Sequence, residues 1–165
     1  MKKRNQAPSV AQYIKTLSFL HVVITATPLI MGVLFYFQAE GRTLFLSPTM
    51  DIPLALVTAV GLFGALLGEF LFKRMTRVLS QEIGLKEKLG RYQTASIMKY
   101  ALIEGAALFA MVSFSNTGNG LYAIIGLLLV VHLVLQRPSL AKIGQRLRLK
   151  GEEKAQFAKI DQPLG

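Results

Sequence analysis

The chain has 165 residues, which is room for one domain, and its 19 Lys and Arg outnumber its 9 Asp and Glu to give a net charge of +10. Hydrophobic residues make up 52% of the chain and charged residues only 17%, a balance too apolar for a disordered protein. The absence of cysteine excludes a disulfide scaffold and a thiolate metal site.

The first long apolar segment covers 16–37, between Lys15 and Glu40. Its length suits a helix that crosses a bilayer, which needs roughly 17–25 residues. No small-residue cleavage site follows it, so we expect an uncleaved anchor. Pro28 should kink this helix, and the hydroxyls of Thr25 and Thr27 could satisfy the carbonyl that proline leaves free.

The second apolar segment covers 52–72, after a short loop, and a polar segment, 73–96, follows it. Apolar residues recur in the polar segment at helical spacing and predict a continuation of the second helix, at Met75, Val78, Leu79 and Ile83. Leu85 and Leu89 suggest one further short turn. We therefore expect a cytoplasmic loop that is partly helical.

The third and fourth apolar segments cover 97–115 and 119–136. The residues between them are Asn, Thr and Gly, which supply the backbone angles that a tight turn needs. These two segments should therefore form an antiparallel hairpin.

The tail, 137–165, should contain a basic amphipathic helix that begins near Pro138. Leu140, Ile143 and Leu147 line one face, and basic residues occupy the others. This pattern is typical of a helix at the membrane interface, and it also suits a helix that docks on a partner. From Gly151 onward we expect the chain to fray.

Basic residues fix the expected orientation. Eighteen of the nineteen lie before the first segment, between the second segment and Tyr100 near the start of the third, or after the fourth, and only Arg42 lies on the other side. The positive-inside rule places both termini and the loop 73–96 in the cytoplasm. This distribution explains the charge by topology and contact with anionic lipid headgroups, without nucleic acid.

The predicted fold class is therefore an all-α transmembrane four-helix bundle of two hairpins, in one membrane domain over 1–165. Both termini are cytoplasmic, and the expected location is a bacterial inner membrane. Small residues on the second and third segments predict close helix packing, at Gly61, Gly64, Gly68 and Gly105. That packing can join segments of one chain, or it can join copies in a homo-oligomer or a larger membrane complex.

Each segment holds one ionisable residue within its apolar run: His21, Glu69, Glu104 and His132. All four lie four to six residues from the cytoplasmic basic boundary, at roughly 6–9 Å below it. Because ionisable groups in a membrane are costly, this layer is the candidate functional site.

Four interpretations of the layer stay open. The two carboxylates could share a proton and serve a proton or cation relay. The four residues could bind a transition metal, or the two histidines a haem. The structural alternative is that Glu69 pairs with Lys73 on its own helix and the histidines pack. No cofactor is predicted outright.

Two resemblances add to these patterns. The run from Leu85 to Phe109, with the Thr-Gly-Asn turn at 117–119 and Arg137-Pro-Ser, resembles a family of small bacterial four-span membrane proteins of uncharacterised activity. Separately, the run 101–112 is similar to the carboxylate-bearing helix of rotary ATPase c subunits (proteolipids). That second resemblance implies that Glu104 carries an ion and that Gly61, Gly64 and Gly68 belong to the glycine-rich partner helix.

The sequence contains no catalytic Ser/His/Asp grouping, phosphate-binding glycine loop or zinc-protease motif. We therefore expect a non-enzymatic membrane protein that is a structural or accessory subunit packing laterally. The alternatives are a proton- or cation-handling subunit using Glu69 and Glu104, and a metal or haem site using His21 and His132.

Overall fold

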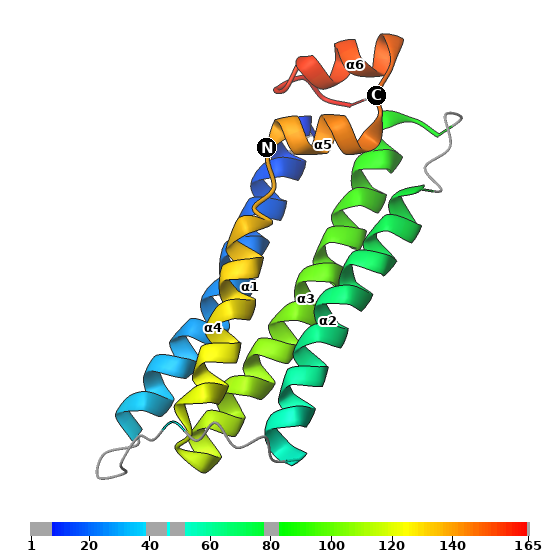
Figure 1. Ribbon diagram of the computed structural model, residues 1–165. Coiled ribbons are helices and arrows are strands. Elements are labelled where there is room, and N and C mark those ends of the chain that lie inside the picture. Colours follow the sequence, from blue (N-terminus) through cyan, green and yellow to red (C-terminus); the bar gives the residue numbers. More distant parts are fainter. Residues whose placement is uncertain (1–7, 39–45, 47–51, 78–82, 165) are drawn as a thin grey trace.

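The protein is all-helical wherever the computed structural model describes the chain, over residues 8–38, 46, 52–77 and 83–164. That part has no β-strand, and its helices are α1 (Val10–Gln38), α2 (Ile52–Arg77), α3 (Leu85–Thr117), α4 (Gly120–Leu135), α5 (Leu140–Leu147) and α6 (Gly151–Ala158). Helices α1 to α4 run lengthwise, and α5 and α6 cross one end (Figure 1). The all-α prediction is confirmed.

Three helices, α1, α2 and α3, are long and apolar enough to cross a membrane. Helix α4 has 16 residues and qualifies only together with α5, from which it is bent by 77°. The described residues thus hold three candidate spans, or four if that bent pair is one span. At about 1.5 Å per residue α4 is about 24 Å long, somewhat less than the roughly 30 Å of a bilayer core.

Helix α3 is the centre of the structure. It packs against α1, α2 and α4, whereas α1 and α2 make few contacts with each other. Glycines let the backbones approach: a Cβ atom on Gly64 would lie 3.0 Å from the carbonyl oxygen of Leu102, and one on Gly68 would lie 3.2 Å from that of Lys99. Gly64 and Gly68 therefore join α2 to α3 within one chain, as one of the two interpretations predicts.

Gly61 packs toward α4, because a Cβ there would lie 3.4 Å from Leu129. Gly105, predicted to pack in the same way, does not do so within the chain. Gly105 is exposed on α3, and nothing lies within 4 Å of the position of a Cβ. Gly105 comes one residue before Ala106, which contacts Gly64, and the helical rotation of about 100° per residue turns Gly105 out of that interface.

The polar segment 73–96 is more helical than expected. Helix α2 continues to Arg77, and α3 already begins at Leu85, with Gly84 as its N-cap residue. The expected short turn at Leu85 and Leu89 is the first part of α3, and both side chains are buried. Val78 and Leu79, predicted to continue the second helix, lie outside the described residues.

Helix α1 continues through Pro28, which is buried. The threonine hydroxyls do satisfy backbone carbonyls, but not the carbonyl that proline leaves free. Thr25 donates to the carbonyl of His21 (2.7 Å), and Thr27 donates to that of Val23 (3.0 Å). Both are ordinary bonds to the residue four positions earlier.

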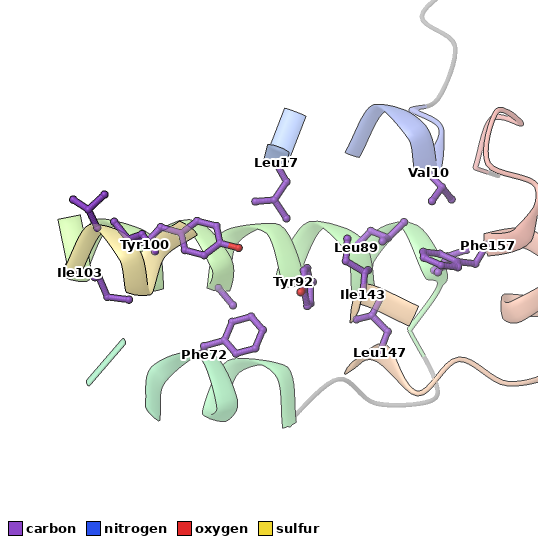
Figure 2. Close-up of a cluster of buried hydrophobic side chains, with 14 of the residues drawn as sticks. Val10, Leu17, Phe72, Leu89, Tyr92, Tyr100, Ile103, Ile143, Leu147 and Phe157 are labelled. Atoms are coloured by element: carbon purple, nitrogen blue, oxygen red, sulfur yellow. The ribbon is translucent and has the colours of Figure 1, made fainter. Parts of the chain in front are cut away.

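The C-terminal helices form a cap on one end of the molecule. Figure 2 shows Ile143 and Leu147 of α5 and Phe157 of α6 meeting Leu89 of α3 and Val10 of α1. Ser139 is the N-cap residue of α5, and its hydroxyl accepts a hydrogen bond from the Lys142 backbone N–H. The apolar face of α5, expected at the membrane interface or on a partner, is covered by the chain itself.

The prediction that the tail frays from Gly151 is also wrong. Residues Gly151–Ala158 form α6, and the tail beyond it is bonded to the start of α1. The Ala11 N–H donates to the carbonyl of Ile160 (3.0 Å), and the Leu164 N–H donates to that of Pro8 (3.3 Å). The tail is ordered because the cap supplies contacts that an isolated short helix lacks.

Candidate functional site

Glu69 is the centre of an ion-pair network between α2 and α3. Its carboxylate lies 2.5 Å from the Lys99 ammonium of α3 and 3.4 Å from that of Lys73, four residues along its own helix. Lys99 is buried, whereas Lys73 is largely exposed. The expected pair with Lys73 is present, but the closer partner comes from the neighbouring helix.

Phe72 extends this network toward the cap. Its ring lies 5.1 Å from the Lys99 ammonium and 5.6 Å from the Arg146 guanidinium of α5, distances at which a cation is attracted to an aromatic ring. The ring also packs edge-on against Tyr92. Lys99 therefore contributes to packing as well as to charge, although its sequence position suggests only a topology signal.

His21 is buried between α1, α3 and α4. Its Nε2 lies 2.8 Å from the carbonyl oxygen of Leu133, and since a carbonyl only accepts, Nε2 is the protonated nitrogen in this bond. The imidazole packs edge-on against Tyr100, whose hydroxyl donates to the carbonyl of Gln136 (3.2 Å). The two side chains thus donate to carbonyls at the C-terminal end of α4, and the Leu133 carbonyl accepts a second bond there from the Gln136 backbone N–H (2.9 Å).

Glu104 and His132 lie elsewhere. Glu104 is half-buried on α3, near the side chain of Thr27 of α1. His132 is exposed on α4. The structure therefore brings Glu69 together with Lys99, and His21 with Tyr100, but it does not gather the four residues of the layer.

No group of three or more His, Cys, Asp or Glu side chains that could hold a metal ion occurs in the part of the chain that the structure describes. His21 uses Nε2 on a backbone carbonyl, and His132 is exposed while His21 is buried. The arrangement that a haem between the two histidines needs is not formed by these residues.

Two further features of the structure are not among the predictions from the sequence. Lys88, near the start of α3, is buried and lies 2.6 Å from Glu153 of α6. An open cleft of about 650 Å³ lies between the start of α1 and the end of α2, with Tyr13 on α1 and Met75 on α2. The rest of its lining comes from the start of α3: Gly84, Lys86, Glu87, Gly90, Arg91 and Thr94.

The sequence gives a partial signal for both features. Lys88 lies between two apolar residues on the face that Leu85 and Leu89 share, which is the buried face of a helix. The cleft follows from Gly84 and Gly90, which add no side chain to its floor. The sequence does not show that Glu153 pairs with Lys88, or that Tyr13 and Met75 line the cleft, because these residues come from other helices.

Comparisons with protein-family models, with curated proteins and with solved structures found no match.

Proposed function

We propose that the chain is a four-span protein of a bacterial inner membrane, with both termini in the cytoplasm. The start of α1, the ends of α2 and α4, the start of α3 and the whole cap share one end of the molecule (Figure 1). The basic residues of these segments lie at that same end, where the positive-inside rule expects the cytoplasm.

Single cysteines test this orientation cleanly, because the chain has none of its own. Asn116→Cys, exposed at the α3–α4 turn, should react with a membrane-impermeant maleimide in intact spheroplasts. Gln145→Cys, exposed on α5, is the matched variant and should react only after permeabilisation. The reverse pattern of labelling would place the cap outside.

Within this membrane protein the proposed role is a non-enzymatic structural or accessory subunit that packs laterally with itself or with a membrane complex. The observation that carries the proposal is the use of Glu69 and His21: both are engaged in contacts between helices, with Lys99 and with the carbonyl of Leu133. Groups held in this way support packing rather than a relay that gives up and regains protons.

The outer face of α2 is the lateral surface that this role would use. It carries exposed large side chains at helical spacing, at Leu62, Phe63, Leu66 and Phe70. A photocrosslinking residue placed at Leu66 should yield a discrete protein adduct in native membranes. Placed at Val57, which is buried, it should not. Absence of an adduct from the whole outer face would contradict lateral packing.

The second candidate is a proton- or cation-handling subunit, and Glu104 is the observation that favours it. Among the described residues, no Lys or Arg is paired with Glu104, whose neighbour is the Thr27 side chain. Proteoliposomes decide between the two functions. The accessory role predicts that a pH or cation gradient decays as slowly as in protein-free liposomes. If the protein instead carries a flux that Glu104→Gln abolishes, the accessory role is wrong and the second candidate is favoured.

A further inference from the structure

One face of α3 is left without a helical partner along nearly its whole length. Its exposed residues recur at spacings of three to four: Glu87, Arg91, Thr94, Met98, Ala101, Gly105, Phe109 and Val112. At 100° per residue these positions form one stripe. The other faces of α3 contact α1, α2 and α4, so the stripe faces the gap between α1 and α2, which touch each other little.

The two parts of this stripe differ in chemistry. Its beginning is the floor of the cleft of about 650 Å³, where Lys86 and Arg91 supply two positive charges and Glu87 one negative charge. Its continuation is apolar, with exposed Met98, Phe109 and Val112. A site with charge at one end and an exposed apolar track leading away from it is complementary to an anionic amphiphile, and the cleft volume is within the usual range for bound small molecules.

The depth of the two parts fits a membrane. Arg91 and Val112 are 21 residues apart on one continuous helix, or about 32 Å. The predicted third span, 97–115, begins six residues, or about 9 Å, after Arg91. Arg91 therefore lies at the level of the headgroups of the near leaflet, and Val112 lies toward the far end of the span.

Arg91 can bind an anion without giving up its present contact. One terminal nitrogen of its guanidinium lies 2.7 Å from the Glu87 carboxylate, and the side chain is half-exposed. A guanidinium has five N–H donors, and the remaining ones can bind phosphate oxygens.

We propose that the cleft and the exposed face of α3 bind one anionic phospholipid. Its phosphate lies at Lys86 and Arg91, and its acyl chains lie along Met98, Ala101 and Gly105 between α1 and α2. Gly105 and Ala101 leave room for a chain close to the helix backbone. The inference rests on the proposed membrane orientation, which the cysteine labelling tests separately.

The test uses the full chain reconstituted in nanodiscs of phosphatidylglycerol and phosphatidylcholine with identical acyl chains, mixed one to one. Native mass spectrometry after release should find one retained phosphatidylglycerol per wild-type chain. The Lys86→Gln, Arg91→Gln double variant should retain it roughly thirtyfold less, since each of the two cations near a headgroup contributes about a fivefold preference. The Lys154→Gln, Lys159→Gln variant is the control, because it removes the same charge from exposed positions outside the cleft.

Equal retention by the two double variants, or equal retention of the two lipids by the wild type, would overturn the proposal. A second measurement examines the apolar part of the site. Gly105→Leu should retain less of the lipid while it keeps the wild-type helical content and melting temperature, since nothing lies within 4 Å of the new Cβ. If Gly105→Cys instead forms disulfide-linked dimers in the nanodisc, a second copy occupies this face and the lipid site is excluded.

Discussion

At Gly64 the backbones of α2 and α3 are in direct contact, and this contact gives the first prediction. In Gly64→Leu the new Cβ would lie 3.0 Å from the Leu102 carbonyl oxygen and 3.3 Å from the Ala106 methyl. Neither atom is the end of a flexible side chain, so the helices must separate. We expect a loss of about 2 kcal/mol of stability, measured by unfolding in mixed detergent and SDS micelles.

Gly105→Leu is the matched control for this prediction. It makes the same chemical change on the facing helix, α3, at a position where a Cβ has open space. We expect its unfolding midpoint to match that of the wild type. Equal losses in both variants would mean that leucine destabilises any glycine position of these helices, and the α2–α3 contact would lose its special role.

At the same scale, Glu69 shows what a sequence can and cannot predict about a residue. Its pair with Lys73 follows from the spacing of four along one helix. Its closer pair with Lys99 joins residues 30 apart in the chain. No local pattern contains that contact, because it depends on how Gly64 and Gly68 bring the two helices together.

The elements show the same division between local and distant information. The four apolar segments predict helices that the structure contains, because hydrophobicity over about twenty residues is a property of the segment alone. The apolar face of α5 is also readable in the sequence. What covers that face is not, because an amphipathic pattern is the same whether lipid or protein covers it.

Helix α6 docks on the start of α3. Its docking on α3 depends on Glu153, which pairs with the buried Lys88. Glu153→Gln leaves that ammonium without its counter-charge, so we expect the docking of α6 to weaken by about 2 kcal/mol. Hydrogen–deuterium exchange should rise over residues 151–158 while exchange within α3 stays slow.

Glu152→Gln is the control, because Glu152 is the neighbouring carboxylate and is exposed. It removes the same charge from the same helix, and we expect exchange in α6 to stay at the wild-type level. Faster exchange in both variants would assign the effect to the N-terminal charge of α6 rather than to the pair with Lys88.

The predicted ionisable layer shows what residue spacing along the chain can and cannot predict about the whole molecule. Distances from the basic residues estimate the depth of His21, Glu69, Glu104 and His132, but not the direction in which each points around its helix. That direction separates them: Glu69 faces α3, His21 faces α4, and His132 is exposed. The direction is set by which helix is central, and this follows from packing rather than from composition.

The central place of α3 gives a prediction for assembly. Helices in a membrane can form separately and then associate through packing, so fragments should assemble according to their contacts. A tagged fragment 81–165, co-expressed with either 1–51 or 46–80, should recover each of them, because α3 packs against both α1 and α2.

Tagged 1–51 should not recover 46–80 when 81–165 is absent, because α1 and α2 contact each other little. The measurement is the amount of untagged fragment that co-purifies in mild detergent. Gly64→Leu provides an internal check, since in the fragment 46–80 it should reduce recovery by 81–165 while recovery of 1–51 is unchanged. If 1–51 and 46–80 associate equally well without α3, the first two helices form a unit of their own and α3 is not the helix that organises the molecule.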